Sequence, residues 1–346
     1  MKVISVTNKK GGTGKTTTAY LLGIGLAKKG YRVLLMDLDW QCHLSYMAGA
    51  ELNRGNILDV LERRVELKDT IQTMGNLLYE IDIVPGSGYL SNNNQDLDWC
   101  FMGKSRTVVI KNLLSPIKEN YDYIIMDLDK EYDIVSINAL IASDSVIIPC
   151  EYSTFSLLAL AQVSNILSSI KEYNPALKVD GILLTQVDHQ ISQDEETINE
   201  FESFAQVLET KIFDTVIRKS VIIPESQAYE EDLFSYAPNA KATQDYLNFI
   251  DEFLAQEQPV ELPTSITSFF INGQTDTKEY IEDLIQRNPP VPTGYKICRL
   301  ENKTERMQIL LTPTLKTMGK EQAKSLGMSF NEYVNYLIEK DLGLPQ

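Results

Sequence analysis

A glycine-rich segment near the start of the chain limits the fold more than any other feature of the sequence. It reads Asn8-Lys9-Lys10-Gly11-Gly12-Thr13-Gly14-Lys15-Thr16-Thr17. An apolar run, Val3–Thr7, precedes the segment, and a helical pattern, Lys15–Lys29, follows it. A turn of this kind between a buried strand and a helix lets backbone N–H groups surround phosphate oxygens. The order strand, loop, helix therefore predicts a phosphate-binding loop in an α/β fold.

The side chains of this loop suit a nucleotide and its magnesium ion. Lys15 can reach the β- and γ-phosphates, and the Thr16 hydroxyl can ligate Mg²⁺. Lys9 stands where the general phosphate-loop pattern requires glycine, so the segment is a variant with an earlier lysine, Lys10. The predicted nucleotide-binding residues are Lys10, Gly11, Gly12, Thr13, Gly14, Lys15, Thr16 and Thr17. The alternative is a glycine-rich turn that binds nothing, and the order of strand, loop and helix argues against it.

Two further apolar runs end in aspartate. Val33–Asp37 leads to Asp39, and the alternation of a strand puts Asp37 and Asp39 on the same face. The alternative for Asp39 is the cap of a strand end or a solvated loop carboxylate. Tyr123–Asp127 has four apolar residues before its aspartate, which is typical of a strand whose carboxylate holds Mg²⁺ through water. We therefore predict Thr16 and Asp127 as the metal-binding residues.

Apolar runs alternate with helical patterns from residue 1 to about residue 254. The predicted strands are Val3–Thr7, Val33–Asp37, Ile81–Val84, Tyr123–Asp127, Ser145–Pro149, Gly181–Thr185 and Ile212–Ile217. The predicted helices are Lys15–Lys29, Arg106–Asn120, Phe155–Tyr173, Glu195–Glu209 and Ala240–Ala255. Several of the runs are almost wholly apolar, as strands buried on both faces are. The pattern predicts a doubly wound, mostly parallel α/β sheet with its active site at the carboxyl ends of the strands.

Length and charge narrow the class of protein. A chain of 346 residues suggests two domains, or one large domain with an appendage. No apolar run reaches the roughly 18 residues of a membrane span, and the N-terminus lacks the features of a signal peptide, so we expect a cytoplasmic protein that does not contact a membrane. The four cysteines lack the spacing of a zinc cluster or a disulfide framework. The formal net charge of −16 means that any contact with DNA must come from a local patch or a separate module.

The phosphate loop and the aspartate strands resemble those of the ParA family, the partition ATPases of plasmids and chromosomes. The resemblance rests on Lys10-Gly11-Gly12-x-Gly14-Lys15-Thr16, on Asp37-x-Asp39 and on Tyr123–Asp127, and it covers about residues 1–254. It implies an ATPase that uses ATP and Mg²⁺ and forms a homodimer. In that dimer, Lys10 resembles an arginine finger that reaches the partner's phosphates, and Asp39 orients the attacking water. The catalytic residues implied are Lys10, Lys15 and Asp39.

The resemblance also implies partners and shows departures from the family. ParA-like proteins bind DNA nonspecifically, associate with the nucleoid when ATP-bound, and have a centromere-binding adaptor protein that stimulates hydrolysis. Trp40 stands where proline is usual, and Leu128-Asp129-Lys130-Glu131 replaces a cysteine and two prolines on a loop near the γ-phosphate. Ile222 stands where a basic residue is common, although Arg218 and Lys219 remain for DNA contact.

Residues 303–346 form a distinct unit, which follows a linker with a short helix at 255–302. The unit has a strand pattern at Arg306–Thr312 and two helix patterns separated by Gly327 and Ser329. This layout resembles a ribbon-helix-helix module, which dimerises through its strand and inserts the resulting ribbon into the DNA major groove. Alternation along the strand predicts the DNA-binding residues Arg306, Gln308 and Leu310. The alternative is a module that only dimerises.

The function that the sequence favours is partition or positioning of a plasmid or other DNA cargo by ATP-dependent dimerisation and DNA binding. One alternative is an ATP-gated transcriptional regulator that binds an operator through its C-terminal module. A positioning ATPase like MinD is less favoured, because the acidic residues Glu332, Glu339 and Asp341 of the last helix pattern would be repelled by anionic lipid. Related folds also include metabolic enzymes, but Lys10 and the C-terminal unit argue against that class.

Overall fold

A computed structural model describes residues 1–76, 79–90, 107–188 and 195–256, together with Lys324. The predicted module at 303–346, with Arg306, Gln308 and Leu310, therefore lies outside the described residues, as does the linker beyond residue 256. The account below concerns the compact unit made of Met1–Gly75 and Glu80–Gln258.

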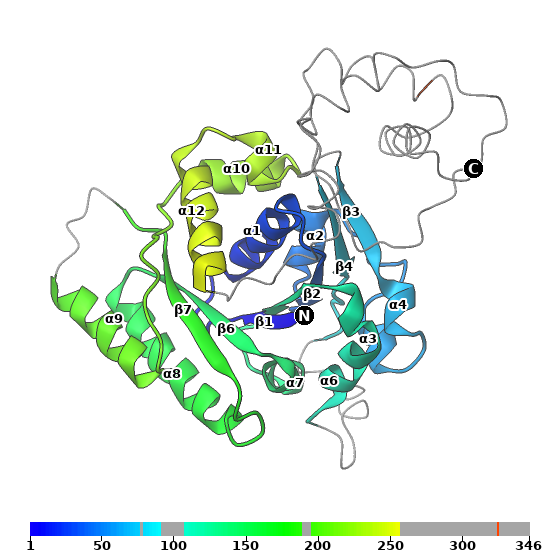
Figure 1. The fold of residues 1–346 in the computed structure, drawn as a ribbon, viewed down its shortest axis with the longest axis horizontal. Coiled ribbons are helices and arrows are strands. Elements are labelled where there is room, and N and C mark those ends of the chain that lie inside the picture. The colour runs from blue at the N-terminus through cyan, green and yellow to red at the C-terminus, as the bar shows by residue number, and fades with distance from the viewer. Residues whose placement is uncertain (77–78, 91–106, 189–194, 257–323, 325–346) are drawn as a thin grey trace, which may run out of the picture. The chain divides into compact units, whose positions relative to one another are not determined.

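Seven strands form one sheet at the centre of this unit (Figure 1). They are β1 (Lys2–Val6), β2 (Val33–Leu38), β3 (Gln72–Asn76), β4 (Tyr79–Val84), β5 (Tyr123–Leu128), β6 (Ser145–Glu151) and β7 (Lys178–Thr185). Their order across the sheet is β3-β4-β2-β5-β1-β6-β7. The pairs β1–β5, β1–β6, β2–β4, β2–β5 and β6–β7 are parallel. The predicted doubly wound, mostly parallel sheet is therefore confirmed.

Helices cover both faces of the sheet, which explains why its central strands are almost wholly apolar, apart from the aspartates near the carboxyl ends of β2 and β5. All six residues of β2 and all six of β5 are buried. The longer helices are α1 (Lys15–Lys28), α7 (Ile134–Ala142), α8 (Thr154–Ile170), α9 (Glu195–Val207) and α12 (Lys241–Gln256). In Figure 1, α1 and α12 lie on one face, whereas α7 and α8 lie on the other with α9 beside α8. Strands buried on both sides have no polar face to expose to water.

The shorter helices occupy the connections between these elements. They are α2 (His43–Ala48), α3 (Ile57–Leu61), α4 (Leu67–Thr70), α6 (Val109–Leu114), the 3₁₀ helix η1 (Ser115–Asn120), α10 (Ile222–Ala228) and α11 (Leu233–Tyr236). Among the described residues, no helix is both long enough and apolar enough to cross a membrane.

Close packing of α1 depends on two glycines in its middle. A Cβ atom on Gly23 would lie 2.7 Å from Cδ2 of Leu35 on β2, and one on Gly25 would collide with Ile250 on α12. Glycine at these positions lets α1 lie directly against the sheet and against α12. Because α1 begins with Lys15, this packing also fixes where the phosphate loop ends.

The structure corrects the strand predicted at Ile212–Ile217. This segment runs beside β7, but its pairing is limited to isolated bridges, from Ile212 to Ile182 and, one residue beyond the predicted strand, from Arg218 to Val187. Its backbone is diverted by Glu252 on α12, whose carboxylate accepts hydrogen bonds from the amides of Asp214 (2.8 Å) and Thr215 (2.9 Å). The segment is therefore extended but does not form a continuous ladder with the sheet.

Several other elements also differ from the sequence-based prediction, and the short helices α2, α3, α4, α10 and α11 were not predicted at all. The helix predicted at Arg106–Asn120 is a short α6 that continues as η1, where Pro116 provides no N–H for α-helical hydrogen bonding. Strand β3 was not predicted, because its sequence, QTMGN, is largely polar. Helix α7 was also missed, because its run IVSINALIA is apolar on nearly every side and shows no amphipathic period.

Candidate active site

The predicted phosphate loop connects β1 to α1 at the carboxyl edge of the sheet. Gly12 (φ 75°) and Gly14 (φ 83°) both adopt left-handed backbone conformations, which glycine reaches at little cost. Gly14 is the N-cap of α1, and its carbonyl accepts the first helical hydrogen bond from the Thr18 amide (2.8 Å). A Cβ atom on Gly12 would meet no other atom within 4 Å, so open space lies beside the loop. The backbone thus has the shape of a cradle whose concave side is accessible.

The end of β7 holds this loop in place. The Thr185 hydroxyl donates to the carbonyl of Thr13 (2.9 Å), and the Gln186 side chain donates to the carbonyl of Gly12. Thr13 is 1% exposed, whereas Gly11 and Gly12 are exposed. The contact of Gln186 was not predicted from the sequence, because contacts between the end of the sheet and the loop depend on the fold.

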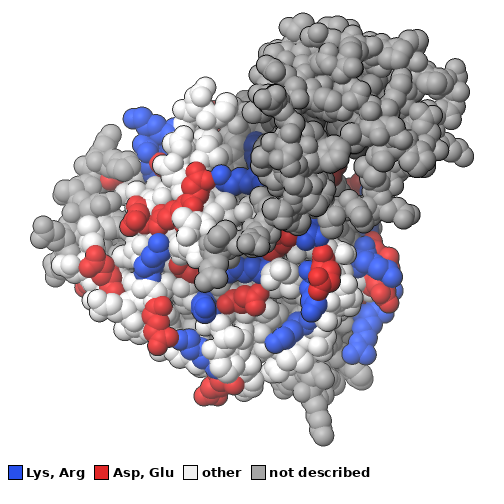
Figure 2. Space-filling view, viewed as in Figure 1, with Lys and Arg blue, Asp and Glu red and all other residues white. Residues whose placement is uncertain are grey.

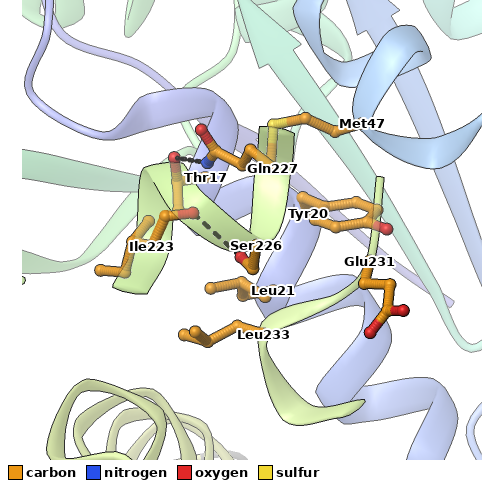
Figure 3. Close-up of a pocket in the computed structure, with 9 residues that line it drawn as sticks. All are labelled: Thr17, Tyr20, Leu21, Met47, Ile223, Ser226, Gln227, Glu231 and Leu233. Atoms are coloured by element: carbon orange, nitrogen blue, oxygen red, sulfur yellow. Dashed lines mark hydrogen bonds between the residues drawn. The ribbon is translucent and has the colours of Figure 1, made fainter. Parts of the chain in front are cut away.

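A small pocket lies on the other side of α1 from the sheet, between its first turns and α10 (Figure 3). Gln227 donates to the Thr17 hydroxyl (3.1 Å) there, so Thr17, one of the predicted nucleotide-binding residues, has a protein partner. The cavity holds about 10 Å³, which is room for one water molecule and far too little for a nucleotide.

Asp127 lies at the end of β5, directly across from Asp37 on β2 in the sheet register. Both carboxylates are completely buried. Among the described residues, neither oxygen of Asp127 has a hydrogen-bond partner. Burial raises the pKa of Asp127 well above its usual value, and the charge of Asp37 adds to this, while the Thr16 hydroxyl and the Lys15 ammonium oppose it. A buried carboxylate without partners is costly, and a cation beside it removes much of that cost.

The residues around Asp127 fit a magnesium ion. Thr16 and Asp127 offer the oxygen ligands that Mg²⁺ prefers, and Mg²⁺ usually takes its remaining ligands from water and substrate phosphates. Among the described residues, no group of three or more His, Cys, Asp and Glu side chains could hold a metal alone. A site with few protein ligands next to a phosphate loop is consistent with a metal that binds together with a nucleotide.

Asp39 follows the end of β2 and is 6% exposed. Its carboxylate accepts the Gln41 amide (2.8 Å), and its own amide donates to Asp37 (3.3 Å). Asp37 accepts both the amide (2.8 Å) and the hydroxyl (2.6 Å) of Ser45, and burial raises the pKa of Asp37 to about 6. Asp37 is thus hydrogen-bonded to α2. Among the described residues, the carboxylate of Asp39 accepts a hydrogen bond from its neighbour Gln41 but none from another helix or strand. Asp37 and Asp39 do lie in the same cluster of carboxylates.

Asp129 is a further buried carboxylate of this cluster, at 4% exposure. Burial raises its pKa, and the charge of Asp39 adds to the shift, while Lys15 opposes it. Lys15 is 8% exposed and is thus the buried cation that faces Asp127 and Asp129. The sequence marked the segment after Asp127 as a departure from the family but assigned no role to it.

Lys10 is held at the other side of the loop. Its ammonium pairs with Glu151 at the end of β6 and donates to the hydroxyls of Ser153 (3.2 Å) and Ser156 (3.3 Å). Its amide donates to Asn8 (3.0 Å). Within one chain, Lys10 therefore points to the β6–α8 junction and is separate from the cluster of Lys15, Asp39 and Asp127.

Comparison with known proteins agrees with this geometry. A family model described as an AAA domain matches residues 1–179, just over half of the chain. Sporulation initiation inhibitor protein Soj of Bacillus subtilis is 32% identical over 257 residues, which cover 73% of this chain and 98% of Soj. The chain belongs to the ParA/Soj/MinD family of P-loop ATPases.

Other relatives extend the match. Chromosome partitioning protein ParA of Caulobacter vibrioides is 28% identical over 75% of this chain and 96% of its own length. The structure of a McdA variant of Cyanothece in complex with ATP superposes with a TM-score of 0.62 at 25% identity, covering 75% of this chain and 99% of McdA. Solved structures of this fold also contain magnesium with the nucleotide. The predicted ATPase class, with ATP and Mg²⁺ as cofactors, is confirmed at the level of the family.

Proposed function

We propose that this ATPase partitions or positions a plasmid or another DNA cargo through ATP-dependent dimerisation and DNA binding. The observation that carries the proposal is the position of Lys10, a second lysine of the phosphate loop, outside the cluster that holds Lys15 and Asp127. A lysine that its own site does not use is available to a partner's nucleotide. The similarity to Soj and ParA over nearly their whole lengths supports the same function.

In this proposal, each residue of the site has a separate role in ATP binding or hydrolysis. Lys15 and the backbone of Gly11 to Gly14 hold the phosphates, while Thr16 and Asp127 hold Mg²⁺, which supplies positive charge to the phosphate oxygens when bound. Asp39 orients the attacking water, because its carboxylate is in the cluster but is not held by a second element. Lys10 enters the partner's site across the homodimer and stabilises charge that develops during transfer.

The described part of the ATPase domain does not offer an evident DNA-binding surface. Arg218, which the sequence left available for DNA, forms two hydrogen bonds with Asp245 (2.6 Å each), and Ile222 replaces a basic residue. On the face drawn in Figure 2, Lys and Arg side chains are interspersed with Asp and Glu, and no continuous basic patch covers the described residues. We therefore assign DNA binding to the C-terminal unit at 303–346, through Arg306, Gln308 and Leu310, after the ATPase domain (1–254) and the linker (255–302).

The proposed partners follow from this function. They are a second copy of the chain, DNA, and a centromere-binding adaptor that stimulates hydrolysis. The proposed location is the cytoplasm, with nucleoid association in the ATP-bound state. The main alternative is an ATP-gated transcriptional regulator that uses the same DNA-binding unit at an operator.

DNase footprinting on the DNA that flanks the gene tests the proposal. The full-length protein is compared without nucleotide, with ADP and with a non-hydrolysable ATP analogue. We expect protection of DNA that requires the ATP analogue and extends over nonspecific DNA at higher protein concentration. Protection of one promoter operator alone, unaccompanied by nonspecific binding, favours the regulator. An absence of DNA binding in all three states at low salt contradicts both functions.

A further inference from the structure

The loop that follows β5, residues 129–133, packs against the phosphate loop. The hydroxyl of Tyr132 accepts a hydrogen bond from the Thr7 hydroxyl (2.9 Å), directly after β1. The ammonium of Lys9 lies 5.8 Å from the centroid of the Tyr132 ring. Tyr132 is 9% exposed and adopts a left-handed conformation (φ 50°). These contacts fix the loop beside the residues that surround the phosphates.

Lys130 also lies close to the phosphate loop. A Cβ atom built on the exposed Gly11 would lie 3.9 Å from Cδ of Lys130, so the Lys130 side chain passes beside this glycine. Its amide donates to the carboxylate of Asp129 (2.6 Å), and Asp129 is itself buried. The backbone immediately before the Lys130 side chain is therefore held in place.

The ammonium of Lys130 is paired with Glu131 and can leave this carboxylate for a more highly charged group such as a phosphate. It lies 3.9 Å from a carboxylate oxygen of Glu131, and both side chains are about half exposed (49% and 53%). Exposed ion pairs of this kind contribute little to stability, because water and salt screen them. The other lysines of the site are engaged elsewhere: Lys15 is buried near Asp127, and Lys10 is paired with Glu151.

A bound triphosphate would add negative charge to a site that already contains several buried carboxyl groups, and a further cation of the same chain would offset part of it. Five aspartates are close enough to influence one another's pKa values, against Lys15 as the buried cation among them. They are Asp37, Asp39, Asp127, Asp129 and Asp133. Mg²⁺, held by Thr16 and Asp127, would offset part of this charge. Lys130 follows the buried Asp129, to which its amide donates, and its side chain passes close to Gly11 of the phosphate loop.

We propose that Lys130 binds the terminal phosphate of ATP and is supplied in cis by the β5–α7 loop. This role differs from that of Lys10, because Lys130 belongs to the same chain as the nucleotide that it contacts. The proposal for Lys130 rests on the proposed ATPase site, in which Asp39 lies near the terminal phosphate of ATP. It does not depend on the proposed role in DNA partition. A charge-assisted contact to phosphate is among the stronger polar interactions in proteins.

The test compares Lys130→Gln with the wild type by titration calorimetry in the presence of Mg²⁺. The probes are a non-hydrolysable ATP analogue and ADP. We expect the variant to bind the ATP analogue about tenfold more weakly, as loss of one charge-assisted contact predicts, and to bind ADP within about twofold of the wild type. Lys130→Arg should retain most of the affinity for the analogue, and Glu131→Gln should bind it as tightly as the wild type or more tightly.

Two controls separate this role from other causes. Lys118→Gln removes an exposed lysine that is likewise near a glutamate (4.0 Å) but lies on η1, and it should bind both nucleotides as the wild type does. Repeating the titrations with Lys10→Ala in the background removes any contribution from a partner's lysine, and the effect of Lys130→Gln should persist there. Unchanged affinity of Lys130→Gln for the ATP analogue overturns the proposal. Equal weakening for ADP and the analogue also overturns it, because that result indicates altered packing of the phosphate loop.

Discussion

Three aspartates within one cluster differ in role because their surroundings differ. Among the described residues, Asp127 is buried without a hydrogen-bond partner, Asp37 accepts from the amide and hydroxyl of Ser45, and Asp39 accepts from the amide of its neighbour Gln41. The first arrangement suits a metal, the second suits support of the backbone, and the third suits a group that acts on water. The sequence identified all three residues. Strand alternation only put Asp37 and Asp39 on the same face, and it was the family resemblance that singled out Asp39, because the different partners of the two carboxylates depend on which element packs against each.

A comparison of Asp39→Ala with Lys15→Ala separates chemistry from binding. In the proposed mechanism Lys15 contacts the phosphates already in the bound ground state, so Lys15→Ala should lose tight nucleotide binding. Asp39 is proposed to act on water, so Asp39→Ala should bind ATP with nearly wild-type affinity but hydrolyse it at least about tenfold more slowly. Equilibrium binding of a fluorescent ATP analogue and phosphate release measure the two effects. Normal turnover of Asp39→Ala would transfer the water-orienting role to another carboxylate, with Asp129 as the first candidate.

The pH dependence of stability reports on Asp37. Its pKa is about 6 in the folded protein, above the usual value of 3.8, because the carboxylate is buried. Stability from the neutral form is therefore complete below about pH 4 and is lost as the pH rises through 6. Without nucleotide and Mg²⁺, we expect the wild type to lose roughly 2–3 kcal/mol relative to Asp37→Asn between pH 4 and pH 7.5. Urea unfolding of both proteins at the two pH values measures this difference. If the stability of the wild type and of Asp37→Asn changed equally with pH, ionisation of Asp37 would not destabilise the folded protein.

At the scale of elements, apolar patterning identified most strands of the sheet and missed the features that depend on tertiary packing. The strands β1, β2, β5, β6 and β7 were predicted from largely apolar runs, and β4, with the sequence YEIDIV, was predicted from its last four residues. The run at Ile212–Ile217 was predicted as a strand too. However, two of its amides, those of Asp214 and Thr215, donate to the carboxylate of Glu252 on α12 and therefore do not pair with a strand. Edge positions are where such competition is possible, because only one side of the backbone meets another strand.

Removal of Glu252 tests this account of the edge segment. In Glu252→Ala, the amides of Asp214 and Thr215 lose their acceptor, and Lys211 loses an ion-pair partner at 3.3 Å. We expect a loss of roughly 1–3 kcal/mol in the free energy of unfolding. Asp251→Ala is the matched control, because this neighbouring carboxylate is 63% exposed and pairs only with Lys29 among the described residues. It should cost less than about 1 kcal/mol. Equal effects of the two substitutions in urea unfolding would contradict a special role for Glu252.

At the scale of the whole molecule, an acidic protein contains a phosphate-binding loop. The net charge of −16 opposes an approach of nucleic acid, and the described surface offers no continuous basic patch on the face in Figure 2. The family, the fold and the phosphate loop followed from residues 1–254 of the sequence. The cargo did not, because recognition of a partner depends on surfaces that neither apolar patterning nor a phosphate loop specifies.

ATP-dependent dimerisation is the property of the whole molecule on which the proposed function depends. When two nucleotide sites face each other, each partner's Lys10 must leave Glu151 and approach the opposite phosphates, which provide more negative charge than one carboxylate. Light scattering with a non-hydrolysable ATP analogue should show a dimer for the wild type and mainly monomer for Lys10→Ala, with at least about tenfold slower ATP hydrolysis in that variant. Lys118→Ala is the control, since Lys118 is an exposed lysine on η1 that belongs to neither loop of the site. It should dimerise and hydrolyse ATP as the wild type does. A Lys10→Ala protein that dimerises and turns over normally would remove the reason for assigning this lysine to the partner's site.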